Sequence, residues 1–177
     1  RAIMPICRRA EHPGMLVGRM PWLGLAEIEL ARAEGVPSAP ALREMRDMMW
    51  QLQIARADTD AASADLIGGI VFTRSLNKLP TWQVARPLAF IGPMLAEPSL
   101  TEADELPSEM VQMFEALRFL RQLSAGDHEG HMYAAGGDWR WGVRPTPWEQ
   151  SMPIDASAMA LICVCQTIYG LERLEAR

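Results

Sequence analysis

The sequence predicts an all-α fold built from consecutive antiparallel helical hairpins. Apolar residues recur at helical spacing in several segments, and proline or glycine stands at the ends of these segments. No competing run alternates apolar and polar residues over the length of a strand. Of the 177 residues, 49% are hydrophobic and 22% are charged, so we expect residues 1–177 to form a single domain with its own core.

The first two helices form the first expected hairpin. A helix is predicted over residues 21–34, because Pro21 suits a first helical turn and Gly35 suits a C-terminal cap. Ser38 is a suitable N-cap for the second helix, which carries the clearest amphipathic pattern in the sequence. We expect the polar residues 58–60 to end it.

The middle of the chain contains two further segments. Residues 65–72 fit either a short helix or a short strand, because a β-branched run there contains two glycines, and we favour the helix. Thr81 can cap a helix that runs to Leu95. Pro87 lies inside that helix, so we expect a kink or a late start there.

The last two helices are predicted over residues 108–124 and 153–175. The final helix is apolar around much of its circumference from Met159 to Val164, so we expect it to be central. Residues 125–152 form a long loop rich in glycine and tryptophan between these helices. Loops of this length are uncommon in compact domains and are often functional.

The loop supplies the candidate binding residues. In an extended segment Trp139 and Trp141 would point the same way, and their rings could hold an apolar or cationic group. The full predicted set for a ligand or a protein partner is Trp139, Arg140, Trp141, Arg144 and Trp148. The alternative is that the tryptophan rings fill gaps between helix ends.

A metal site is the second candidate in this loop. Asp127, His128 and His131 could bind zinc or a similar ion, with a further ligand from elsewhere. The spacing does not match the helical zincin motif. The alternative is a solvated loop tip without a metal.

The net charge and the length of the most apolar run argue against two classes of protein. The net charge of −5 argues against nucleic acid as a main partner. The most apolar run, residues 156–168, is shorter than the ~20 residues that a membrane-spanning helix needs. The three cysteines, Cys7, Cys163 and Cys165, give no disulfide framework and leave the compartment open.

Two segments carry a resemblance to a known family. Residues 116–122, Ala-Leu-Arg-Phe-Leu-Arg-Gln, followed by Gly136-Gly137-Asp138-Trp139, resemble the prenyltransferase and squalene-cyclase repeat. The resemblance implies an α/α toroid, in which inner and outer helices alternate around a cavity. The family includes terpene cyclases, protein prenyltransferases and non-catalytic relatives. The cyclase Asp-x-Asp-Asp motif is absent and the prenyltransferase zinc set is not recognisable, so no catalytic residue is assigned.

Three functions follow as expectations. The first is a non-catalytic scaffold, toroid-like in fold, whose loop binds an apolar small molecule or a protein. The alternative is an isoprenoid cyclase or prenyltransferase-like enzyme, with or without zinc as its cofactor. The third is a structural fragment, because the chain begins at Arg1 rather than Met and we expect it to belong to a longer protein. Its partner would then be the remainder of its own parent chain.

Overall fold

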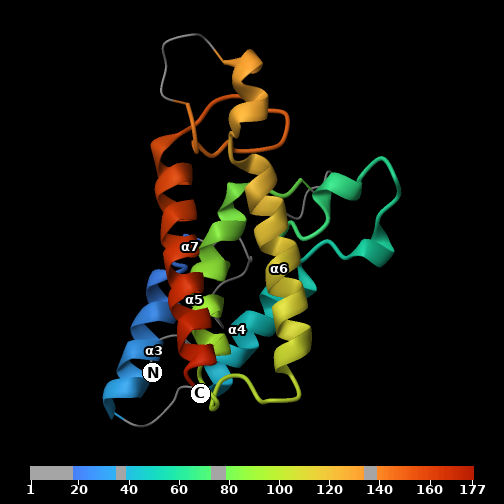
Figure 1. The fold of residues 1–177 in the computed structure, drawn as a ribbon. Helices are drawn as coiled ribbons and strands as arrows, with labels where there is room; N and C mark the ends of the chain where they lie inside the picture. The colour runs from blue at the N-terminus through green and yellow to red at the C-terminus, as the bar shows by residue number, and fades with distance from the viewer. Residues whose placement is uncertain (1–17, 35–38, 73–78, 134–138) are drawn as a thin grey trace.

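The computed structural model describes residues 18–34, 39–72, 79–133 and 139–177 (Figure 1). These residues form five α-helices and no strand, so the prediction of an all-α fold is confirmed. The helices are α3 (Trp22–Glu34), α4 (Ala39–Gln51), α5 (Ala85–Leu95), α6 (Leu106–Leu123) and α7 (Ile154–Glu175). Short 3-10 helices occur at Arg56–Asp58, Ala64–Leu66, Trp82–Val84 and Asp127–Met132.

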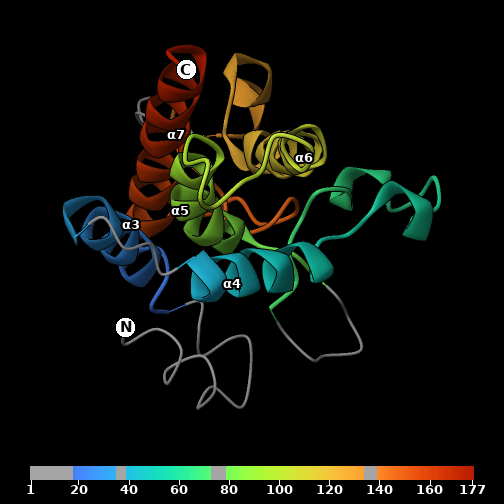
Figure 2. The same cartoon turned by 90° about the horizontal axis from the view of Figure 1, so that it is seen from below.

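Helix α5 is the centre of the fold. Every residue of α5 except Arg86 is buried, and Figure 2 shows α3, α4, α6 and α7 arranged around it. The prediction that the last helix is central is therefore wrong. Helix α5 is apolar on all sides apart from Arg86, whereas α7 buries one face and leaves the other exposed. A helix that is apolar all round is best accommodated inside the core.

Helix α5 packs most extensively against α7, and the two run in the same direction (Figure 1). Glycine permits this contact. A Cβ atom at Gly170 would lie 2.3 Å from the carbonyl oxygen of Gly92, and one at Gly92 would lie 3.0 Å from the Cα of Thr167. The main helix pair is thus not consecutive in sequence. The described residues show no toroid or repeat arrangement.

Most predicted helix positions are confirmed. Helices α3, α6 and α7 begin and end within two residues of the expected positions. Helix α5 has the late start expected from Pro87, because it begins at Ala85 after the 3-10 helix Trp82–Val84. The hydroxyl oxygen of Thr81 accepts a hydrogen bond from the backbone N–H of Gln83 at 3.3 Å, so the predicted cap is present.

Helix α4 ends at Gln51, before the polar residues 58–60. Beyond it the backbone pairs with the glycine segment instead of continuing the helix: Ile54 N donates to Gly69 O at 2.8 Å and Gly68 N donates to Ile54 O at 2.9 Å. The short helix favoured over residues 65–72 is wrong. Only Ala64–Leu66 forms a 3-10 turn, and Gly68, at φ +88°, turns the chain out of helical geometry.

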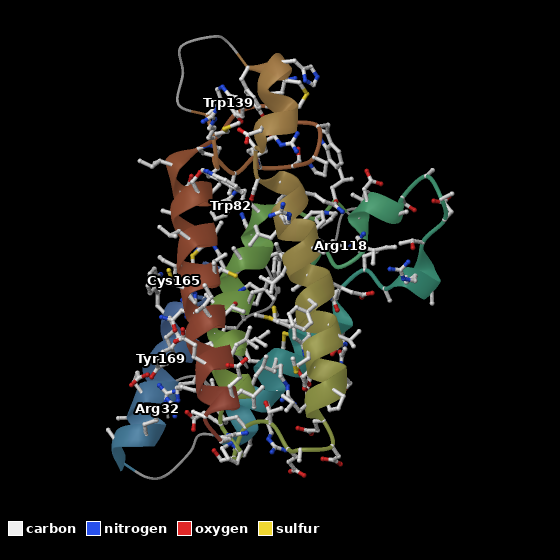
Figure 3. The ribbon with its side chains drawn as sticks, in the orientation of Figure 1. Arg32, Trp82, Arg118, Trp139, Cys165 and Tyr169 are labelled. Atoms are coloured by element: carbon white, nitrogen blue, oxygen red, sulfur yellow. The ribbon has the colours of Figure 1, made fainter. Side chains whose placement is uncertain are left out.

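An ion-pair cluster joins the C-terminal ends of α3, α5 and α7. Glu97 follows α5 and accepts from Arg32 of α3 at 2.7 Å and from Arg173 of α7 at 3.0 Å. Both guanidinium groups also lie near the ring of Tyr169, at 5.8 and 5.6 Å from its centroid. Figure 3 shows Arg32 and Tyr169 side by side. This cluster fixes α3 against the lower half of α7.

Candidate functional site

The loop after α6 folds back on the end of that helix. Ala125 N donates to Gly142 O at 2.8 Å, and Trp141 N donates to Ala125 O at 3.0 Å. An isolated antiparallel bridge joins Ser124 to Val143. These bonds place Trp141 between the carboxyl end of α6 and the start of α7.

Trp141 adopts a strained backbone conformation. It lies in a turn closed by a hydrogen bond of 3.1 Å from Gly142 N to Trp139 O, and its φ is +65°. Residues other than glycine rarely adopt this left-handed conformation, and bulky residues least of all. The side chain is nevertheless 72% exposed, so burial of the ring does not offset the strain.

An apolar groove of about 470 Å³ lies between α6 and α7, beside Trp141. Both helices pack against α5, and they stand apart from each other along the groove (Figure 2). The residues that line it are mostly apolar, and they are Leu117, Leu120, Arg121, Ser124, Trp141, Val143, Ser157, Ala160, Leu161 and Val164.

The groove has three polar side chains. Ser157 Oγ accepts from Val143 N at 3.0 Å, and Ser124 Oγ donates to Leu120 O at 3.4 Å, so both hydroxyls serve the local backbone. Arg121 is exposed on the α6 rim. Within the part of the chain that the structure describes, no ion pair holds its guanidinium. A ligand lying in the groove would therefore meet apolar walls and one available positive charge.

Arg144 was predicted to contact a ligand, but its surroundings are those of a helix cap. It is only 8% exposed. Its guanidinium donates to Gln122 O at 2.6 Å and to Pro147 O at 3.3 Å. The last carbonyl groups of α6 have no partner within the helix, and Arg144 satisfies some of them.

The other predicted loop residues separate from one another. Trp139 stacks on Tyr133 with ring centroids 5.2 Å apart, whereas Trp141 faces the groove. The expectation that Trp139 and Trp141 point the same way is wrong, because a turn replaces the extended segment. Arg140 pairs with Asp127 at 3.2 Å, and Trp148 is 56% exposed outside the groove. Trp139 thus packs on Tyr133 and not on the groove, and Trp141 alone of the predicted residues lines the groove.

The predicted metal ligands lie on and around the 3-10 helix Asp127–Met132. Asp127 is engaged by Arg140, and His131 is exposed. The side chain of His128 lies outside the described part of the chain. Among the side chains that are described, no three of His, Cys, Asp and Glu lie close enough to hold a metal ion together.

The α7 wall of the groove was not predicted as a site. Leu161 is 63% exposed and Val164 is 43% exposed. The signal was present in the sequence, because α7 carries apolar residues on more than one face. That pattern was interpreted as central burial, whereas in the structure it covers a core face and an exposed face.

Helix α7 is also longer than the apolar run of residues 156–168. The helix has 22 residues, and an 18-residue window within it has a mean hydropathy of 1.5. It is therefore long enough and apolar enough to span a membrane. The expectation that no segment reaches this length is therefore corrected. The core helix of a soluble protein meets the same criteria, and 33% of the window is buried inside this fold.

Comparison with known protein families, with characterised proteins and with solved structures gives no match to this chain.

Proposed function

We propose that this chain is a non-catalytic helical scaffold that binds an elongated apolar ligand, or the apolar side chains of a protein partner, between α6 and α7. The observation that carries the proposal is the groove of about 470 Å³ with its mostly apolar lining. Small-molecule sites occupy roughly 300–1,000 Å³ and are lined mainly by hydrophobic side chains with a few polar groups.

The conformation of Trp141 supports this assignment. A bulky residue in the left-handed region costs on the order of 1 kcal/mol, and such strain is concentrated at functional positions. An exposed ring does not recover that cost through burial. A ligand in the groove would cover the ring and would provide the missing contact area.

Arg121 supports a ligand that has an anionic end. Its guanidinium is exposed at the rim and can form a charge-assisted hydrogen bond with a carboxylate. An apolar chain with a carboxylate at one end would use both the walls and this charge. We therefore favour a fatty-acid-like ligand over a neutral hydrocarbon.

A titration with a long-chain fatty acid, followed by calorimetry and by displacement of an apolar fluorescent dye, tests the proposal. Trp141→Gly should weaken binding by about tenfold, equivalent to roughly 1.4 kcal/mol. Trp148→Gly is the matched control, because Trp148 is exposed but does not line the groove. Failure of both probes to bind, or equal losses in both variants, would contradict the proposed site.

The charge is tested separately with a fatty alcohol of the same chain length. Arg121→Gln should remove any preference for the acid over the alcohol while the alcohol binds as before. If Arg121→Gln still prefers the acid over the alcohol, another group binds the carboxylate.

The alternative is an isoprenoid cyclase or prenyltransferase-like enzyme. The resemblance in residues 116–122 supports it, and an apolar groove would suit an isoprenoid. No carboxyl or imidazole side chain lines the groove among the described residues, so we place this function second. Stoichiometric zinc in the purified protein, lost on His128→Ala, would reverse the order.

A partial α/α toroid remains the finer proposal for the fold. Its support is the same resemblance, together with the antiparallel directions of α6 and α7 around the Gly/Trp-rich loop (Figure 1). The sequence of a longer parent chain would test it. Further helical hairpins beyond these residues would support the toroid, and their absence from the parent would remove it.

A further inference from the structure

A stripe of exposed side chains runs along the outer side of α7. Its members recur at intervals of four and three residues, and we call them the α7 stripe: Ile154, Ala158, Leu161, Cys165 and Ile168. Ile154 is 87% exposed, Leu161 63% and Ile168 50%. Figure 3 shows Cys165 on this outer side. No charged residue occurs between Asp155 and Glu172.

The spacing of the stripe is that of a helix-pairing seam. Apolar residues at alternating intervals of four and three form the face that one helix buries against another in coiled coils. The opposite face of α7 already packs on α5. The α7 stripe is thus a second apolar face on a helix whose first face is occupied. Within the described residues nothing covers it, and Leu161 is the stripe member that also lines the groove.

The stripe is complementary to itself in one orientation. Four of its five positions lie symmetrically about Cys163, so in an antiparallel pair centred there Ala158 faces Ile168 of the second copy, whereas Ile154 lies at the end of the contact, opposite Glu172. Leu161 likewise faces Cys165 of the second copy. Each small side chain thus meets a large one, which is the arrangement that fills space between two helices. Parallel pairing in register would instead set large against large and small against small.

We propose that α7 pairs antiparallel with α7 of a second copy of this chain through the α7 stripe. A two-fold symmetric interface uses the same patch on both subunits, as this self-complementary stripe allows. Stable interfaces bury about 800 Å² per partner, and a single five-residue stripe offers less, so we expect a weak dimer that forms only at high protein concentration.

A lipid bilayer is the competing occupant of this face. Helix α7 has the length and composition of a membrane span. Its inner residues Met159, Cys163 and Gly170 are buried against the core, however, and spanning a bilayer would strip α7 from α5. The single apolar stripe fits one partner helix, whereas a spanning helix faces lipid on most sides.

Analytical ultracentrifugation of the full chain from low to several hundred micromolar concentration tests the dimer. The wild-type chain should change from monomer to dimer across this range. Ala158→Glu, which places a charge in the stripe, should stay monomeric with unchanged helicity. Ala26→Glu is the matched control on an exposed position of α3, and it should dimerise as the wild type does. A wild-type chain that stays monomeric throughout overturns the proposal.

The orientation is tested with a short bismaleimide in a Cys7→Ser background. Cys165 should be cross-linked to Cys165 of the second copy, because both lie near the two-fold axis. In a Cys7→Ser, Cys165→Ser, Ile154→Cys chain no link should form, since antiparallel pairing separates the two ends by about 27 Å at 1.5 Å per residue. A link at position 154 overturns the antiparallel arrangement.

Flotation with neutral phosphatidylcholine vesicles tests the bilayer. Flotation that is lost in Ala158→Glu would assign the stripe to the membrane and overturn the dimer. Ala158 does not line the groove, so Ala158→Glu should still bind the fatty acid. Failure of the dimer and failure of the groove are therefore seen in different measurements.

Discussion

The indole Nε1 of Trp50 in α4 donates a hydrogen bond of 2.6 Å to Glu109 Oε2 in α6. The other carboxylate oxygen of Glu109 lies 3.2 Å from Arg46 Nε, and Arg46 also donates to Leu100 O at 3.0 Å. All three side chains are buried. Burial raises the pKa of Glu109 above its ordinary value, and the Trp50 hydrogen bond and the Arg46 charge offset this only in part. The cluster fixes α4 against α6.

Removal of one member of this cluster should be costly. Glu109→Ala leaves the buried indole N–H of Trp50 without its acceptor and removes one of the carboxylates beside Arg46, which keeps Asp47 at 3.2 Å and Glu105 at 3.7 Å. We therefore expect the free energy of unfolding in urea to fall by about 2 kcal/mol. Arg43→Ala is the comparison on the exposed side of α4, where the pair with Glu102 at 3.1 Å should contribute less than about 1 kcal/mol. Similar losses in both variants would show that burial does not distinguish the two pairs.

The two cysteines of α7 should react at very different rates. Burial raises the pKa of the Cys163 thiol to about 12, whereas Cys165 is exposed. In dilute Cys7→Ser protein a maleimide should modify Cys165 and leave Cys163 intact until the chain unfolds. If the α7 stripe pairs as proposed, Cys165 should react more slowly as the protein concentration rises. Early labelling of Cys163, read by peptide mass, would contradict its burial.

The Cys163 thiol also predicts a dependence of stability on alkaline pH. The folded chain holds the proton to about 12, whereas an unfolded thiol releases it near 9.0. The unfolded state therefore binds fewer protons in this window, and stability present below 9.0 is lost as the pH rises toward 12. Urea unfolding across this range should show the loss, and Cys163→Ala should have a shallower slope.

Arg144 should matter for stability more than for binding. Arg144→Met keeps the apolar part of the side chain but removes its bonds to Gln122 O and Pro147 O. Buried carbonyl groups left unpaired cost about 1–3 kcal/mol, so a thermal melt should show a clear loss. Arg140→Met, which breaks the exposed pair with Asp127, should change the melt little. Normal stability in Arg144→Met would mean that water replaces these bonds.

The contact between α5 and α7 is sensitive to a single methyl group. Gly170→Ala would place a Cβ 2.3 Å from the carbonyl oxygen of Gly92, which is backbone and cannot move aside without separating the helices. We expect a loss of about 3 kcal/mol or incomplete folding, at the upper end of overpacking effects. Gly18→Ala is the control, because nothing lies within 4 Å of the added atom. Unchanged stability in Gly170→Ala would contradict the close approach.

Local patterns in the sequence were sufficient to place most helices. Thr81 and Pro87 located the start of α5, and the apolar spacing in residues 108–124 located α6. These signals act within one or two turns of the chain. The end of α4 was not predictable in the same way, because it depends on hydrogen bonds between Ile54 and the glycines of residues 68–69.

The site was harder to predict than the helices. Trp141 was among the candidates because it lies in a long loop rich in glycine and tryptophan, and it lines the groove. Leu117 and Val164 were missed, because nothing local indicates that α6 and α7 would stand apart across α5. Arg144 was placed among ligand contacts since sequence cannot distinguish an arginine that binds a ligand from one that satisfies buried carbonyl groups.

Helix α7 is secured at both ends: Gly170 lies against Gly92 near one end, and Ser157 accepts from Val143 N near the other. It therefore cannot roll about its own axis to suit an incoming molecule. Its outer surface acts as a rigid template, and binding to a preorganised surface loses little conformational entropy. The exposed residues of α7 could therefore be substituted to bind a chosen helix, while its buried residues continue to stabilise the fold.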